Sequence, residues 1–174
     1  MATKVHADAP VFLIGFMASG KTTVGRIVAA ELNWQFRDLD QVITDAAARS
    51  VPQIFADEGE AGFRGRESEA LRAASAWRRT VVATGGGAAC SDANLALMLA
   101  SGRVVALSVT ADEVARRAGG DSGRPLLTSA AAASTLLAAR APFYARAHNQ
   151  VDTVGKSPEV VAAEVLSLLE ADPS

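Results

Sequence analysis

The sequence GFMASGKT, residues 15–22, follows the apolar run VFLI at residues 11–14. It matches the pattern Gly-x4-Gly-Lys-Ser/Thr, in which backbone N–H groups and the N-terminus of the following helix bind phosphate. The apolar run is typical of a strand that is buried on both faces. After this turn the spacing becomes helical, with Val24 and Val28 on one side. A strand, a glycine-rich turn and a helix in this order predict a parallel α/β protein that binds a nucleoside triphosphate.

Four more segments have the apolar or β-branched composition of strands. They are residues Trp34–Leu39, Thr80–Thr84, Val104–Val109 and Val151–Thr153. Helical patterns separate them, and the last helix is predicted to begin at Pro158, because proline fits the first turn of a helix. The pattern predicts a single α/β domain with a five-stranded parallel sheet flanked by helices. Ligands of such a sheet bind beyond the carboxyl ends of its strands.

Length and composition narrow the class of protein. The chain has 174 residues, which suffices for one domain, and its net charge of −2 argues against a nucleic-acid partner. No apolar run reaches the roughly 18 residues that a membrane-spanning helix needs. Residues 1–9 lack the features of a secretory signal and are expected to be flexible. A single cysteine, Cys90, excludes an internal disulfide, so we expect a cytoplasmic protein. We also expect a monomer, and the lack of a long apolar run argues against membrane contact.

Two residues of the phosphate-binding sequence have specific expected roles. Lys21 is expected to reach the β- and γ-phosphates, and the Thr22 hydroxyl is expected to bind Mg²⁺. This motif indicates that the chain binds a nucleotide, and it leaves the phosphate acceptor open.

Two carboxylates stand at the end of the second predicted strand. Asp38 and Asp40 are two residues apart, so in an extended chain their side chains point the same way. One carboxylate could serve a metal ion and the other a hydroxyl group. Alternatively, both are solvated acids at a strand end. The phosphate-binding sequence favours the functional interpretation.

A run of three glycines, residues 85–87, follows the third predicted strand. A ligand can approach such a backbone closely, but a tight turn before a helix explains the run equally well. Arg64, Arg124 and Arg140 could bind carboxylates or phosphates through their planar guanidinium groups. Arg64 and Glu67 are three residues apart, so they are predicted to lie on one face of a helix. Most arginines are solvated surface residues, so each position taken alone is weak evidence.

Together these segments resemble the shikimate kinases, small members of the P-loop class related to nucleoside monophosphate kinases. The resemblance runs from about Pro10 to Leu169. It rests on GFMASGKTTVGRIVAAEL, FRDLD, IFADEGEAGFRGRE, TGGGA, GRPLL, RAPFYARA and VDT, in that order. It implies a P-loop kinase fold and transfer of the ATP γ-phosphate to the 3-hydroxyl of shikimate. The products would be shikimate 3-phosphate and ADP, in the pathway to chorismate and the aromatic amino acids.

The resemblance implies a role for individual residues. Catalysis would depend on Lys21, on Asp40 to orient or deprotonate the hydroxyl, and on Arg124 of a lid. Mg²⁺ would be held by Thr22 and, through water, by Asp38. The nucleotide site would comprise Gly15, Ala18, Ser19, Gly20, Lys21, Thr22, Thr23, Arg117, Arg124 and Lys156. The shikimate site would comprise Asp40, Arg64, Gly86, Gly87 and Arg140, with the two arginines on the carboxylate.

Two segments would complete the enzyme. Residues 41–73 would form a substrate-binding segment, and residues 119–131 would form a lid over ATP. The glycine-rich residues 119–123 suit a loop, and the Ala- and Ser-rich residues 128–134 suit a helix. The stretch between Arg124 and Arg140 is shorter than in the resembled family, so the length of the lid is left open, although both arginines are present.

Three other functions are possible for a chain with this phosphate-binding sequence. A kinase of the same fold could use another small hydroxy acid such as gluconate, but Arg64, Arg140 and Asp40 match the shikimate pattern. A non-catalytic nucleotide-binding module would be expected to lack residues such as Lys21 or Asp40, and both are present. A nucleoside monophosphate kinase would need a pocket for a base in place of the two arginines.

Overall fold

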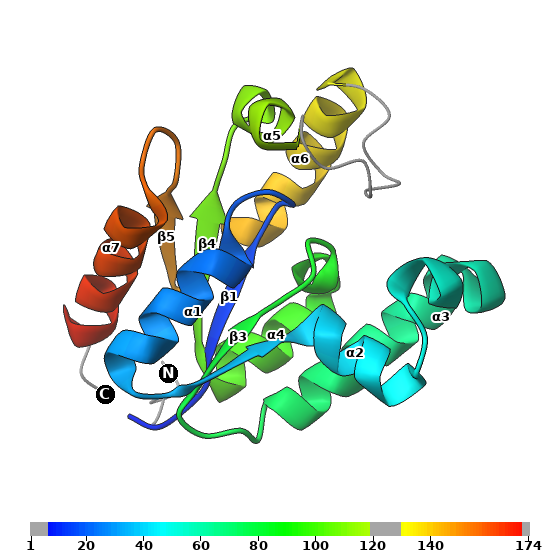
Figure 1. Ribbon diagram of the computed structural model, residues 1–174, viewed down its shortest axis with the longest axis horizontal. Helices are drawn as coiled ribbons and strands as arrows, with labels where there is room; N and C mark the ends of the chain where they lie inside the picture. Colours follow the sequence, from blue (N-terminus) through cyan, green and yellow to red (C-terminus); the bar gives the residue numbers. More distant parts are fainter. Residues whose placement is uncertain (1–6, 119–129, 172–174) are drawn as a thin grey trace.

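The computed structural model describes residues 7–118 and 130–171. Within these residues, five parallel strands form one sheet in the order β2-β3-β1-β4-β5 (Figure 1). The strands are β1 (Val11–Gly15), β2 (Gln35–Asp38), β3 (Thr80–Ala83), β4 (Arg103–Ser108) and β5 (Asn149–Asp152). The predicted five-stranded parallel sheet is therefore confirmed.

Helices connect the strands and cover both faces of the sheet (Figure 1). They are α1 (Lys21–Leu32), α2 (Leu39–Ala47), α3 (Val51–Ala74), α4 (Asp92–Ser101), α5 (Ala111–Ala118), α6 (Ala130–Tyr144) and α7 (Pro158–Ala171). A short 3₁₀ turn, η1 (Ala88–Cys90), follows the three glycines. No helix in the described ranges is long and apolar enough to cross a bilayer.

The central strand β1 explains why the core has two halves. Its residues Val11 and Leu13 pack with α1 and α7 on one face, whereas Phe12 and Ile14 pack with α3, α4 and α6 on the other. Successive side chains of a strand point to opposite faces, and both faces are covered here. The run VFLI at residues 11–14 is therefore apolar throughout, as predicted for a strand buried on both sides.

Helices α2 and α3 coincide with the predicted substrate-binding segment. They extend away from the β2 edge of the sheet (Figure 1). The N-cap residue of α3 is Ser50, whose hydroxyl accepts a hydrogen bond from the Gln53 N–H. The helix is kinked at Gly59, where φ is 72° and ψ is −177°. Glycine adopts such backbone angles without a side-chain clash, so the chain can change direction there.

The position of Asp40 differs from the sequence prediction. Strand β2 ends at Asp38, and Asp40 lies in the first turn of α2 rather than in an extended chain. The reason is local: Asp38 is the N-cap of α2, and its carboxylate accepts a hydrogen bond from the Asp40 N–H at 3.1 Å. A capping carboxylate stabilises the start of a helix, so the two-residue alternation stops at Asp38.

Two predicted segments fall largely outside the described residues. The lid, residues 119–131, contributes only its last two residues to the described structure, and Arg124 is outside it. Of the opening segment 1–9, residues 1–6 are outside the described ranges. Ala9 is buried, and the Asp8 carbonyl accepts a hydrogen bond from the Arg79 N–H at 2.8 Å, so residues 8 and 9 are packed.

Candidate active site

The loop between β1 and α1 surrounds the ammonium group of Lys21. That group donates hydrogen bonds to the carbonyl oxygens of Gly15 at 2.9 Å and Phe16 at 2.8 Å. Helix α1 begins at Lys21, so its first N–H groups have no partner within the helix and face the loop. A buried cation next to the first N–H groups of a helix is an arrangement that favours binding of phosphate. The remaining predicted nucleotide residues of this region are Ala18, Ser19, Gly20 and Thr23.

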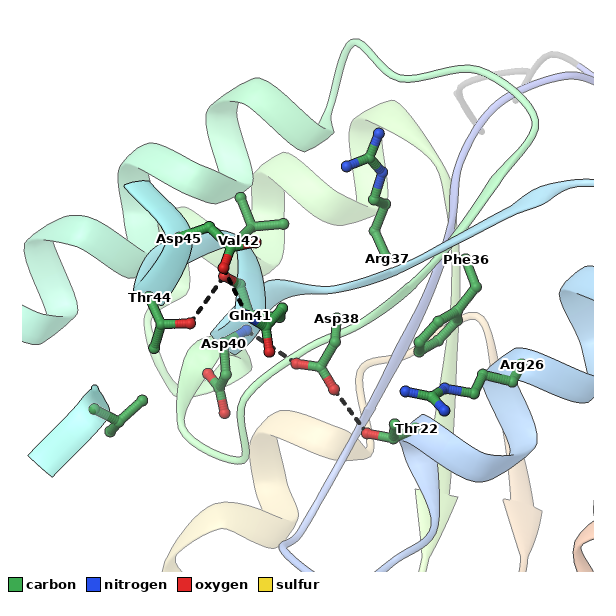
Figure 2. Close-up of a pocket in the computed structure, with 11 residues that line it drawn as sticks. Thr22, Arg26, Phe36, Arg37, Asp38, Asp40, Gln41, Val42, Thr44 and Asp45 are labelled. Carbon is green, nitrogen blue, oxygen red and sulfur yellow. Dashed lines mark hydrogen bonds between the residues drawn. The ribbon is translucent and has the colours of Figure 1, made fainter. Parts of the chain in front are cut away.

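Thr22 and Asp38 form the pair predicted to hold a metal ion. The Thr22 hydroxyl donates to Asp38 Oδ2 at 2.8 Å, between the start of α1 and the end of β2 (Figure 2). Hydroxyl and carboxylate oxygens suit Mg²⁺, which usually keeps several water or phosphate ligands. Among the described residues, no group of three or more His, Cys, Asp or Glu side chains could hold a metal ion. The donor set therefore fits an ion that arrives with a nucleotide.

Asp40 has a carboxylate oxygen that awaits a hydrogen-bond donor. Its Oδ1 atom is buried and has no hydrogen-bond partner among the described residues. Burial raises the pKa of Asp40 above its ordinary value, and the nearby charge of Asp38 raises it further, against the opposing effect of Lys21 and Arg64. A buried acceptor without a donor is rare in proteins, and a ligand hydroxyl could satisfy this one.

Glu67 holds Arg64 in the orientation that faces this region. Arg64 Nη1 donates to Glu67 Oε2 at 2.9 Å, which confirms the pairing expected from their spacing in α3. The Glu67 side chain is only 1% exposed, and its Oε1 atom has no hydrogen-bond partner in the described structure. Burial raises the pKa of Glu67, and Arg64 opposes that rise. Sequence reasoning treated Glu67 only as a helix partner; its burial was the missing signal.

The three glycines bring these charged groups together. At each glycine of residues 85–87, a charged side chain lies where a Cβ would stand. The nearest atoms to those positions are Glu67 Oε1 at 2.8 Å and Asp40 Oδ1 at 3.0 Å for Gly85, Arg140 Nη1 at 3.2 Å for Gly86, and Arg64 Nη2 at 2.5 Å for Gly87. At Gly85 and Gly87 the shortest distances are under 3.0 Å, so a Cβ there would displace these charged groups, and four charged side chains therefore lie close to the turn.

Helix α6 links the turn to the phosphate-binding loop. Arg140 is 9% exposed, and its guanidinium carbon lies 5.6 Å from the centre of the Phe16 ring. One helical turn later, the Tyr144 hydroxyl donates to the Gly86 carbonyl oxygen at 2.6 Å. Sequence reasoning did not identify Tyr144, although its spacing of four residues from Arg140 places both on one helix face.

Two predicted nucleotide residues, Arg117 and Lys156, lie outside the phosphate-binding loop. Arg117 of α5 reaches the phosphate-binding loop, where its Nη1 donates to the Ala18 carbonyl oxygen at 2.9 Å. Lys156 lies between β5 and α7, and its ammonium group pairs with Glu164 of α7 at 2.8 Å. Arg117 therefore contacts the phosphate-binding loop, whereas Lys156 forms an ion pair with α7.

A cavity of about 670 Å³ adjoins the metal-site pair and Asp40 (Figure 2). Its other lining residues are Arg26, Phe36, Arg37, Gln41, Val42, Thr44, Asp45 and Val51. Arg64, Arg140 and the three glycines do not belong to this lining. Asp40 therefore stands between two regions, and the region of the glycine turn is the one with two buried or half-buried cations.

Comparisons with known proteins show the family to which this chain belongs. A family model described as shikimate kinase matches residues 17–170. A shikimate kinase from Geobacter metallireducens is 44% identical over 163 residues, which cover 92% of this chain and 91% of the relative. A solved shikimate kinase from Acinetobacter baumannii, in complex with shikimate, has a TM-score of 0.89 at 34% identity and covers 94% of this chain and 93% of its own. A gluconokinase from Sinorhizobium meliloti, at 14% identity and a TM-score of 0.64, covers 95% of this chain and 94% of its own, and shows a shared fold alone.

Proposed function

This chain belongs to the shikimate kinase family, and we propose from its geometry how its residues divide the work of the reaction. It is an ATP-dependent kinase that transfers the γ-phosphate to shikimate, giving shikimate 3-phosphate and ADP. The convergence of Asp40, Arg64 and Arg140 on the glycine turn is the observation that carries the assignment of the acceptor site.

The chemistry of shikimate matches the groups around this turn. Shikimate is a small acid with three ring hydroxyls, so its site needs a cation for the carboxylate and an acceptor for the hydroxyls. Arg64 and Arg140 can each bind a carboxylate through two parallel hydrogen bonds. Glu67 holds Arg64 in place at 2.9 Å. Backbone groups of Gly86 and Gly87 lie next to these two arginines and would line the same site.

Asp40 is proposed to act on the reacting hydroxyl. Its unpaired Oδ1 atom would accept the hydroxyl hydrogen and orient the oxygen for attack on the γ-phosphate. Burial raises the pKa of Asp40, which makes its carboxylate a stronger proton acceptor than an exposed one. Lys21 would exchange its bonds to loop carbonyls for bonds to phosphate oxygens, and would stabilise the negative charge during transfer.

Mg²⁺ is the proposed metal, and Thr22 with Asp38 are the residues that would hold it. The hydroxyl of Thr22 would bind the ion directly, and Asp38 would act through water. Bound with ATP, the ion would neutralise charge on the β- and γ-phosphates. The hydrogen bond of 2.8 Å between the two side chains supports this role, because it shows that both oxygens face the same point.

The remaining assignments rest on the family resemblance. Arg117 and Lys156 would contact the adenine, and Arg124, in the segment 119–131, would close over ATP as part of a lid. A lid excludes water, which would otherwise accept the γ-phosphate. We further propose a cytoplasmic monomer that needs no nucleic acid or membrane, consistent with one cysteine and a net charge of −2.

A coupled assay of ADP release with Mg-ATP tests the acceptor. Shikimate, gluconate and no acceptor are compared at the same enzyme concentration. We expect release that depends on shikimate and stays near the background rate with gluconate. If ADP is released with gluconate and not with shikimate, the two arginines bind another acid. If the rate of ADP release is the same with either acid and without one, the protein only hydrolyses ATP.

A further inference from the structure

Arg117 makes more contacts than the adenine role requires, and we propose that it is a positioning residue for the phosphate-binding loop. Its guanidinium group donates a hydrogen bond to the Ala18 carbonyl and another to the Glu113 carboxylate, and we call this set of contacts the brace. The inference deepens the proposed kinase function and rests on it. It gives Arg117 a contribution to binding the triphosphate that does not depend on the base.

The guanidinium of Arg117 joins three segments that follow different strands. Its Nη1 donates to the Ala18 carbonyl at 2.9 Å and to the Thr153 hydroxyl at 3.2 Å. Its Nη2 donates to the Thr153 carbonyl at 2.9 Å, and its Nε donates to Glu113 Oε1 at 2.8 Å. The loop after β1, the helix after β4 and the turn after β5 thus meet at one side chain.

Ala18 is the place in the loop where such support is needed. Its φ is 60°, a left-handed conformation in which the Cβ of an ordinary residue crowds the following carbonyl. The next peptide group is bound from both ends, because the Ser19 N–H donates to the Phe16 carbonyl at 3.2 Å. Since a peptide group is planar, these two bonds set its orientation and therefore the path of the chain into Gly20 and Lys21.

The anchors behind Arg117 are themselves fixed. Thr153 is 2% exposed, and both its N–H and its hydroxyl bind the Ser108 carbonyl, at 3.0 Å and 2.9 Å. Glu113 is 8% exposed, and its carboxylate also accepts two hydrogen bonds from Arg116. Hydrogen bonds from Arg116 and then Arg117 lower the pKa of Glu113 to about 2, so the carboxylate stays charged at neutral pH.

The edge and the face of a guanidinium can serve two ligands at once. Hydrogen bonds leave from the edge of Arg117 in the plane of the group, whereas an aromatic base would stack on its face. The brace and the adenine contact are therefore compatible. They differ in one consequence: only the brace affects a phosphate ligand that carries no base.

The test compares Mg-ATP with Mg-tripolyphosphate, which lacks the base, as ligands of the full-length protein. Dissociation constants are measured by calorimetry for the wild type, Arg117→Lys, Glu113→Gln and Arg116→Gln. Lysine keeps the charge but cannot hold three partners in one plane. Arg116, whose side chain is 71% exposed, binds the same carboxylate without reaching the loop, so its variant is the matched control.

We expect Arg117→Lys to weaken tripolyphosphate binding roughly tenfold or more, as for loss of hydrogen bonds to a charged donor. Glu113→Gln should weaken it less, and Arg116→Gln should leave it within about twofold, with the KM for shikimate unchanged in all three. If Arg117→Lys weakens ATP but not tripolyphosphate, the brace is overturned while the kinase function stands. If neither Arg117→Lys nor Glu113→Gln changes either affinity, the brace is overturned as well. A wild type that binds both ligands but never phosphorylates shikimate would instead overturn the proposed function.

Discussion

In the phosphate-binding half of the site, residues 15–22, the groups proposed to bind the nucleotide come from consecutive residues. In the acceptor half, the groups proposed to bind shikimate come from four separate segments, which are Asp40, residues 64–67, residues 85–87 and Arg140. The first half consists mainly of backbone groups and one lysine, whose ammonium already binds the carbonyls of Gly15 and Phe16. The second half combines the backbone of three glycines with charged side chains, and Asp40 and Glu67 each have a buried oxygen with no hydrogen-bond partner among the described residues.

This difference has an energetic meaning. Lys21 is satisfied by its own loop before any ligand is present, so the phosphate half is formed in advance. Asp40 Oδ1, in contrast, is buried and has no hydrogen-bond partner among the described residues. In the proposed reaction, the substrate hydroxyl would donate a hydrogen bond to this atom.

Asp40→Asn should have the largest effect and should separate the two halves. An amide keeps the shape of the carboxylate but accepts a proton poorly, so we expect kcat to fall roughly 10²- to 10⁴-fold. The dissociation constant of ATP should stay the same, because the phosphate half does not use this side chain. The kcat is measured at saturating shikimate, and the dissociation constant of ATP is measured by calorimetry.

The matched control for this variant is Asp45→Asn. Asp45 lies in the same helix, is exposed and accepts a hydrogen bond from Gln41 at 2.6 Å. Its loss should leave kcat close to the wild-type value. Weaker ATP binding in Asp40→Asn would mean that the two halves are coupled, and an unchanged kcat would remove Asp40 from the proton transfer.

Arg140→Ala should affect the acceptor half through binding. Removing one partner from a desolvated charge pair typically costs about 2–5 kcal/mol, so we expect the KM for shikimate to rise roughly 30-fold or more. Arg146→Ala is the control, because Arg146 forms an exposed ion pair with Asp92 beyond the end of α6. Such pairs contribute little. Steady-state kinetics over a range of shikimate concentrations decides the point, and equal KM values in the two variants would exclude Arg140 from the acceptor site.

The smallest effect concerns the kink that separates the two parts of α3. Glu58, next to the kink at Gly59, binds Arg66 through two hydrogen bonds of 2.8 Å and Arg49 through one of 2.5 Å. These bonds, with Arg66 first, lower the pKa of Glu58 from 4.5 to about 2. The lower pKa in the folded state means that the charged form stabilises the fold. That stabilisation is complete above pH 4.5 and disappears as the pH falls toward 2.

Glu58→Gln should therefore unfold at a lower urea concentration than the wild type at pH 7, and the gap between them should narrow below pH 4.5. Urea midpoints at pH 7, 5 and 4 measure this. Asp57→Asn is the control, since Asp57 is 56% exposed and pairs with Arg49 alone. A gap that stays constant with pH would show that the charge of Glu58 does not stabilise the kink.

Several parts of the fold could be predicted from short stretches of sequence. The five strands, the helices that begin at Lys21 and Pro158, and the pairing of Arg64 with Glu67 all follow from local spacing and composition. Asp40 lies just after the end of β2, as predicted, but its backbone is helical rather than extended. The reason is that Asp38 is the N-cap residue of α2. Tyr144 was missed as a site residue, because the Gly86 carbonyl that its hydroxyl binds lies far away in the sequence. Glu113 binds Arg116 and Arg117 within α5, and only the contact of Arg117 with Ala18 connects this helix to the phosphate-binding loop.

The sequence by itself determined the phosphate-binding loop and the class of fold. Each depends on neighbouring residues, through glycine conformations, helix N–H groups and the alternation of side chains along a strand. The acceptor site was decided by the tertiary structure. The order β2-β3-β1 places the ends of three strands side by side, and α6, which comes later in the sequence, places Arg140 next to Gly86. Burial then decides the chemistry, since the pKa of Asp40 is raised mainly by its burial, which no local pattern specifies.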